Sequence, residues 1–108
     1  MREPHHPSCA ELELSDVLHA LSDPARLEIA RRLSSAPGEE WACSAFDLGL
    51  SKATLSHHFR VLREAGVVKT RVAGRKRLQS LRREDLDTCF PGLLDAVLNG
   101  YAGHRHAA

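Results

Sequence analysis

The stretch SKATLSHHFRVLREAGVVKTRVAGRKRLQSL, residues 51–81, decides the fold. Its first half has helical periodicity between Ser51, a good N-cap residue, and Gly66, a good C-terminal stop. Its second half contains two β-rich runs, VVKTRV and RKRLQSL, separated by an Ala-Gly turn, and this pattern predicts a hairpin. A helix followed directly by a basic hairpin is the order of a recognition helix and its wing. We therefore predict a mainly α-helical fold, a winged helix-turn-helix with a β-hairpin wing.

The predicted helix after Ser51 has one apolar face and one polar face. At about 100° per residue, Leu55, Phe59 and Leu62 lie on one side, and we expect them to point inward. His58 falls toward the same side, so we interpret it as a packing or hydrogen-bonding residue. The outward side carries small and hydrogen-bonding side chains, which suit the major groove of duplex DNA.

The candidate DNA-binding residues occupy this outward face, the start of the helix and the hairpin. Free backbone amides at a helix start favour phosphate, and small polar side chains can reach base edges. Lysine and arginine on the hairpin would neutralise phosphates. The set consists of Ser51, Lys52, Ala53, Thr54, Ser56, His57, Arg60, Arg71, Arg75, Lys76 and Arg77.

Charge is unevenly divided along the chain. The whole sequence has a formal net charge of only +1, but residues 51–83 hold ten Lys and Arg against one acidic residue. This asymmetry predicts a polyanion-binding face on an acidic body, with a solvated charged surface as the alternative. The one aromatic residue of the predicted helix, Phe59, is expected to point inward, which favours duplex DNA over base stacking on single strands.

The N-terminal half supplies the remaining helices of the motif. An amphipathic helix is predicted over residues 12–21, and a second helix begins with Asp23 as N-cap and Pro24 in its first turn. Residues 41–48 predict a short third helix. The turn at residues 49–51 then gives the spacing of a helix-turn-helix.

The C-terminal part is a final helical region, residues 82–101, in which Pro91 starts a new turn or causes a kink. Its apolar stripe consists of Leu86, Phe90, Leu94, Val97 and Tyr101. We predict a flexible N-terminal arm at residues 1–10, one DNA-binding and dimerisation domain at residues 11–103, and a C-terminal tail at residues 104–108.

Two stretches, ALSDPARLEIARRL (residues 20–33) and LGLSKATLSHHFRVLREAGVVKTRVAGRKRLQSL (residues 48–81), resemble the ArsR/SmtB family of bacterial repressors. The resemblance covers roughly residues 18–81. It implies a homodimer built on the first and last helices, bound to an imperfect inverted repeat in double-stranded DNA. The first helix and the final stripe carry more apolar surface than a small core obviously absorbs, which agrees with such an interface.

The resemblance also implies release from DNA when a metal or an oxidant binds. Imidazole-rich arms suit nickel or zinc, and the alternative is that these arms are flexible polar tails. Asp87-Thr88-Cys89 resembles the Asp-x-His element of the family, with cysteine in place of histidine. The candidate metal ligands are His5, His6, Cys9, Asp87, Cys89, His104 and His106.

Cys43 is the candidate redox thiol, and the alternative is a buried, inert cysteine. Two further hypotheses remain: a cysteine-based redox regulator, and a winged helix that contacts protein or RNA, including a protein co-regulator. No Ser-His-Asp, HExxH or phosphate-loop pattern occurs, so we predict no enzyme. The absence of an apolar run of roughly 20 residues predicts no membrane span, and we expect a cytoplasmic protein.

Overall fold

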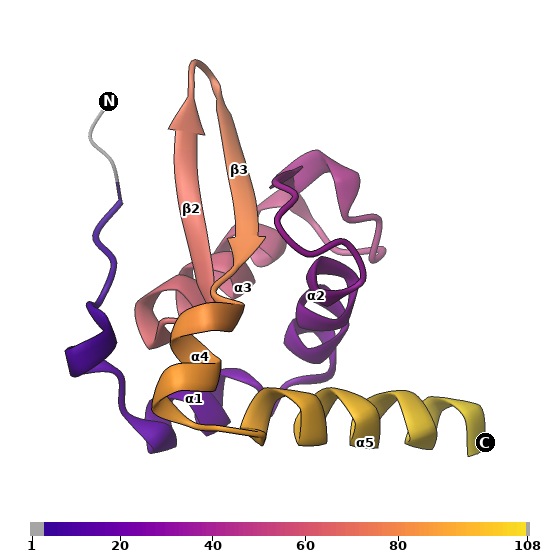
Figure 1. Cartoon of the computed structure of the whole chain (residues 1–108). Coiled ribbons are helices and arrows are strands. Elements are labelled where there is room, and N and C mark those ends of the chain that lie inside the picture. The colour runs from indigo at the N-terminus through magenta and orange to yellow at the C-terminus, as the bar shows by residue number, and fades with distance from the viewer. Residues whose placement is uncertain (1–3, 108) are drawn as a thin grey trace.

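The structure is a computed structural model that describes the backbone of residues 4–107 and the side chains of residues 4–103. Within this part of the chain, helices surround the base of a long β-hairpin that projects from one side (Figure 1). The elements are the 3-10 helix η1 (Cys9–Glu11), α1 (Leu14–Ala20), α2 (Pro24–Ser34), β1 (Trp41–Ala42), the 3-10 helix η2 (Cys43–Ala45), α3 (Lys52–Ala65), β2 (Val68–Ala73), β3 (Lys76–Leu81), α4 (Arg83–Cys89) and α5 (Leu93–Ala107).

The local signals predicted in the sequence set the ends of α2 and α3. The Asp23 carboxylate accepts hydrogen bonds from the backbone N–H groups of Ala25 and Arg26, at 2.9 and 3.1 Å. The Ser51 hydroxyl accepts one from Thr54 N–H at 3.1 Å. Gly66 ends α3 with φ of 89°, a left-handed conformation that glycine adopts at little cost. These boundaries confirm the predicted helices.

The prediction of a helix at residues 41–48 was wrong. Trp41–Ala42 forms β1, which pairs antiparallel with β3, and a short 3-10 turn follows at η2. A helix of this length is marginal in water, so tertiary contacts decide its conformation. The Trp41 ring packs on Phe46 with centroids 5.5 Å apart, and Phe46 packs on Phe59 of α3 at 5.1 Å. Pairing with β3 and this aromatic row take the place of helical hydrogen bonds.

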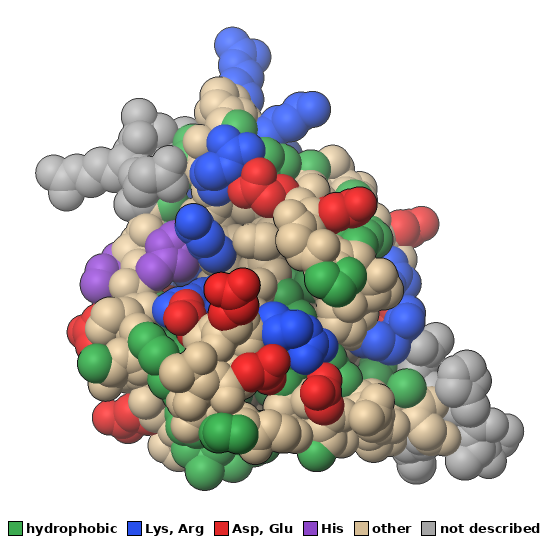
Figure 2. Space-filling view, viewed as in Figure 1, with side chains coloured by type: hydrophobic (Ala, Val, Ile, Leu, Met, Phe, Trp, Pro, Cys, Tyr) green, Lys and Arg blue, Asp and Glu red, His purple; other side chains and the backbone are tan. Residues whose placement is uncertain are grey.

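The wing is the predicted hairpin extended to three antiparallel strands in the order β1-β3-β2. Its register runs from Val68 opposite Leu81 to Ala73 opposite Lys76. The turn therefore falls at Gly74-Arg75, one residue later than predicted. The free end of the wing carries Lys and Arg side chains (Figure 2).

The core lies between α2, α3, α5 and the root of the wing. Leu55, Phe59 and Leu62 of α3 are buried, as the helical spacing predicts. In the C-terminal stripe, Leu86 and Leu94 are also buried within the chain, so part of the apolar surface expected at a dimer interface serves the core instead. The exposed apolar side chains of α1 are Leu14, 47% exposed, and Leu18, 45% exposed.

One buried guanidinium joins three helices. Arg26 of α2 donates from Nε to the carbonyl of Ala20, at the end of α1, over 2.6 Å. Its Nη1 lies 3.2 Å from Nδ1 of His58 on α3. Both Arg26 and His58 are buried, and the Asp23 carboxylate lies 3.9 Å from the same imidazole nitrogen. His58 is thus the hydrogen-bonding residue that the sequence predicted.

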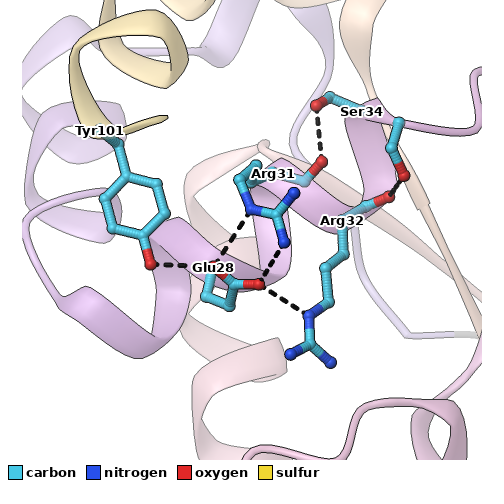
Figure 3. A network of polar contacts seen from close by, with 6 residues as sticks. Glu28, Arg31, Arg32, Ser34 and Tyr101 are labelled. Carbon is cyan, nitrogen blue, oxygen red and sulfur yellow. Dashed lines mark hydrogen bonds and ion pairs between the residues drawn. The ribbon is translucent and has the colours of Figure 1, made fainter. Parts of the chain in front are cut away.

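A second polar cluster ties α5 to α2 (Figure 3). The Glu28 carboxylate accepts hydrogen bonds from Arg31 at 2.6 Å, from Arg32 at 2.8 Å and from the Tyr101 hydroxyl at 2.9 Å. The Arg31 hydrogen bond is the main cause that lowers the pKa of Glu28 to about 2, with further lowering from Arg32 and Tyr101 against the opposing effect of burial. The ionised carboxylate therefore stabilises the folded chain.

We predict that this cluster makes stability acid-sensitive. The folded pKa of Glu28 lies below its ordinary value of 4.5, so the stabilising contribution of the carboxylate is complete above about pH 4.5 and is lost as the pH falls toward 2. The loss should amount to no more than about 3 kcal/mol in the free energy of unfolding. Urea denaturation across this pH range measures it, and Glu28→Gln should flatten the dependence. The exposed Glu84→Gln is the matched control; equal slopes in the parent and both variants would contradict the prediction.

Candidate nucleic-acid interface

The outward face of α3 is polar and open to solvent. Ala53, Ser56, His57 and Arg60 are exposed. The Ser51 hydroxyl is engaged in the cap, where it also donates to the Thr54 hydroxyl at 2.9 Å. The helix start therefore presents backbone N–H groups, and the following turn presents side chains that can accept and donate hydrogen bonds.

The wing and α3 meet at a hollow that joins three separate parts of the chain. Lys52 and Ser56 of α3 line one side of it, residues 42–44 of β1 and η2 line the floor, and residues 75–77 of the wing close it. Arg75, Lys76 and Arg77 are exposed. The structure thus places the predicted helix residues and wing residues around one basic surface, whose outer end is visible at the tip of the wing in Figure 2.

Two of the predicted arginines already have acidic partners. Arg71 on β2 donates from Nε and Nη2 to the Glu40 carboxylate, both at 2.8 Å. These hydrogen bonds are the main cause that lowers the pKa of Glu40. Arg60 faces Glu64 at 3.4 Å, with both side chains well exposed, and such a pair contributes little. The Glu40 carboxylate therefore partly neutralises the charge of Arg71. The same ion pair ties the sheet to the segment before β1.

Arg63 is a basic residue of this surface that the sequence reasoning missed. It follows Ser56 by seven positions and Arg60 by three, so helical spacing alone places it on their side of α3. It lines the hollows beside Arg77, and its Nε is buried without a hydrogen-bond partner among the described residues. Burial, with repulsion from Arg77 and Arg60, lowers the pKa of Arg63 against the opposing effect of Glu64. A guanidinium that lies beside a second arginine, with its Nε free within the described part of the chain, suits an anion.

The described part of the segment predicted as a flexible arm, residues 4–10, runs beside β2 in the structure (Figure 1). His6 Nε2 accepts a hydrogen bond from Thr70 N–H at 2.9 Å, and the Pro7 carbonyl accepts one from Arg82 at 2.8 Å. Burial, followed by the charges of Arg63 and Arg82, lowers the pKa of His6. Arm flexibility itself stays a prediction.

The candidate metal ligands are only partly brought together. Cys9 and Cys89 have their sulfur atoms 2.6 Å apart. Asp87 faces Arg83 at 3.7 Å, and His5 is exposed. Among residues whose side chains the structure describes, no three or more His, Cys, Asp or Glu side chains gather as a metal site. The side chains of His104 and His106 lie outside the described part.

Cys43 lies beside the basic surface rather than in the deep core. Its sulfur is half-buried, accepts a hydrogen bond from Gln79 Nε2 at 3.3 Å and lies 3.9 Å from the Arg77 carbonyl oxygen. It also lines the hollow between α3 and the wing. A redox role for Cys43 stays a prediction. Over the described residues, no helix has the length and apolar character to cross a membrane.

Comparison with known proteins gives consistent matches. A family model described as a helix-turn-helix domain matches residues 21–71. The chain is 38% identical over 85 residues to the uncharacterized HTH-type transcriptional regulator YceK of Bacillus subtilis, covering 77% of this chain and 84% of that protein. It is 45% identical over 76 residues to an arsenical resistance operon repressor of Staphylococcus xylosus, covering 69% and 71%.

Among solved structures, an ArsR-like transcriptional regulator from Rhodococcus sp. RHA1 superposes with a TM-score of 0.59 at 25% identity. The match covers 87% of this chain and 86% of that one. Both the sequence and the fold of this chain are therefore similar to those of transcriptional regulators.

We predict that Arg63→Met stabilises the free protein while it weakens DNA binding. The free energy of unfolding should rise by up to about 1 kcal/mol, because the variant removes a guanidinium whose buried Nε has no hydrogen-bond partner among the described residues. The slope of log K against log salt should become shallower by about 1 for each protomer that binds, because each protomer loses one phosphate contact. Urea denaturation and fluorescence anisotropy with a labelled duplex measure the two effects.

The matched control for this prediction is Arg60→Met, at the exposed neighbouring position. It should change the free energy of unfolding by less than about 0.5 kcal/mol. A clear loss of stability in Arg63→Met, or an unchanged salt slope, would contradict the role assigned to Arg63.

Proposed function

The chain belongs to the ArsR family of helix-turn-helix transcriptional regulators, which are DNA-binding proteins and not enzymes, and on this premise we propose that it represses transcription as a cytoplasmic homodimer. Its target would be an imperfect inverted repeat in double-stranded DNA. The observation that carries the proposal is the single basic surface formed by the polar face of α3 and the end of the wing.

In this proposal α3 enters the major groove with its N-terminal half. Ala53 lets the backbone approach the groove, and Ser56 and His57 meet base edges. Lys52, together with the backbone amides at the helix start, holds a phosphate. Arg75 and Arg77 of the wing follow the adjacent backbone or minor groove and supply sequence-independent attraction.

A dimer places two such helices on successive major grooves, roughly 34–36 Å apart. The surface that supports the dimer is α1, where the exposed Leu14 and Leu18 lie four residues apart on one face. We propose that α1 and α5 form the interface.

The finer form of the proposal is induction by a metal, nickel or zinc. Two relatives are named as an arsenical resistance operon repressor and a cadmium resistance regulatory protein homolog, which supports a metal or metalloid signal in general. The described residues of one chain do not assemble a complete site. We propose that His104 and His106 of the tail supply ligands. Removing these two imidazoles therefore tests the proposal.

We predict duplex DNA binding that depends strongly on salt. Each phosphate neutralised by lysine or arginine contributes about −0.9 to the slope of log K against log salt, so a dimer with several contacts should give a steep slope. Anisotropy titration of an inverted-repeat duplex, with single-stranded DNA and RNA as competitors, measures it. A slope near zero, or tighter binding to RNA than to duplex DNA, would refute the proposal.

Paired variants separate base reading from phosphate attraction within the same titration. His57→Ala should reduce discrimination between operator and random duplex, by about 1–3 kcal/mol where a base contact is lost. Arg75→Ala should weaken binding to the operator and to the random duplex by the same factor. Reversed effects would exchange the roles assigned to α3 and the wing.

For the signal, we predict that nickel or zinc weakens operator binding by the parent protein. The double variant His104→Ala/His106→Ala should lose this response and keep nearly the same affinity without metal. Arsenite, added in a parallel titration, tests a thiol ligand instead of an imidazole one. An unchanged metal response in the double variant would refute the imidazole site.

A further inference from the structure

Cys9 and Cys89 are 80 positions apart in sequence, yet their sulfur atoms lie 2.6 Å apart. Cys9 begins η1 in the N-terminal segment, and Cys89 is the last residue of α4. The Cys89 thiol also lies 3.3 Å from the Cys9 carbonyl oxygen, to which it donates. Both residues are half-buried, so a small reagent reaches them from solvent. Neither lines the basic surface between α3 and the wing.

Contacts that do not involve sulfur hold the two cysteines in place. The η1 turn is fixed by a capping box in which Ser8 N–H donates to the Glu11 carboxylate at 2.8 Å. The hydrogen bonds of His6 to β2 and of Pro7 to Arg82 fix the preceding residues. Leu12 packs so closely on Gly66 that a Cβ at this position would collide with the Leu12 side chain. The segment is thus docked on both sides of Cys9.

The spacing of the sulfurs favours a bond between them over a shared ion. A disulfide needs about 2.05 Å, a small change from the observed separation. A zinc ion at about 2.3 Å from each of two thiolates would hold them well over 3 Å apart.

We propose that Cys9 and Cys89 are a reversible dithiol–disulfide pair within one chain, oxidised by a two-electron oxidant of the hydroperoxide class. The Cys9 thiolate attacks one peroxide oxygen and becomes a sulfenic acid, while the other oxygen leaves and is protonated to water. The Cys89 sulfur then attacks the Cys9 sulfur, a second water leaves, and the S–S bond forms. Overall two thiols and one hydrogen peroxide give one disulfide and two waters, and a thiol reductant restores the dithiol.

The bond would fasten the N-terminal segment to α4, and with it to the edge of the wing. Thr70 N–H on the outer edge of β2 is paired by His6 only while this segment stays docked. Oxidation therefore protects that amide, and reduction leaves it dependent on the noncovalent contacts alone. The pair uses two of the candidate metal ligands, is separate from Cys43, and does not rest on DNA binding.

Alkylation followed by mass spectrometry tests the bond in the whole protein. The reduced chain has three free thiols, Cys9, Cys43 and Cys89. After hydrogen peroxide, only Cys43 should react with the alkylating reagent, and dithiothreitol should restore the other two. Cys43→Ser is the matched control and should still form the bond, whereas Cys9→Ser and Cys89→Ser should not.

Hydrogen exchange at the Thr70 amide gives a second measurement that does not depend on thiol chemistry. It should slow on oxidation of the parent and of Cys43→Ser, and stay unchanged in Cys89→Ser. Three reactive thiols after peroxide, or a disulfide between two chains on a non-reducing gel, would overturn the proposal. Neither measurement uses DNA, so a failure here is distinct from a failure to bind an operator.

Discussion

The orientation of α3, the helix that we propose to face DNA, depends on one buried side chain, the guanidinium of Arg26. It satisfies the last carbonyl of α1 and an imidazole nitrogen of α3 from a position on α2. A buried carbonyl or imidazole nitrogen left without a partner costs on the order of 1–3 kcal/mol, so these groups hold the three helices at fixed angles. With α3 fixed in this way, Leu55 and Phe59 enter the core and Ser56 and His57 face solvent. The chemistry of the exposed face thus follows from a contact on the buried one.

The basic surface differs from this buried contact, because its neighbouring positive charges lower the stability of the free protein. Arg63 and Arg77 lie close enough to lower the pKa of Arg63, and one nitrogen of Arg63 is buried without a partner among the described residues. Such an arrangement is unfavourable in the free protein and becomes favourable when an anion arrives. Elsewhere the chain pairs its charges, as in the Glu28 cluster that ties α5 to α2.

The N-terminal segment supports the wing from its outer side. It covers the outer edge of β2, where an unpaired strand would otherwise expose backbone N–H groups, and it meets the end of α4 at Cys9 and Cys89. The wing is therefore held by β1 on one edge and by this segment on the other. Its free end carries the basic residues that we assign to the DNA backbone.

The sequence by itself determined the features that depend on neighbours within a few positions. Asp23, Ser51 and Gly66 set the ends of α2 and α3 through local hydrogen bonds and backbone conformation, and the spacing of Leu55, Phe59 and Leu62 set the inward face. The candidate DNA-binding residues lie close together in the sequence, on α3 and the wing that follows it. The helical spacing of α3 and the position of the hairpin therefore also indicated most of the basic surface.

Only the tertiary structure decided what depends on residues distant in the chain. Residues 41–48 became a strand and a turn because aromatic packing and pairing with β3 outweigh the weak preference of a short helix. The burial of Arg63, the pairing of Arg71 with Glu40 and the meeting of Cys9 with Cys89 likewise have no local signal. Each results from the path of the folded chain, since sequence spacing constrains only side chains on the same element.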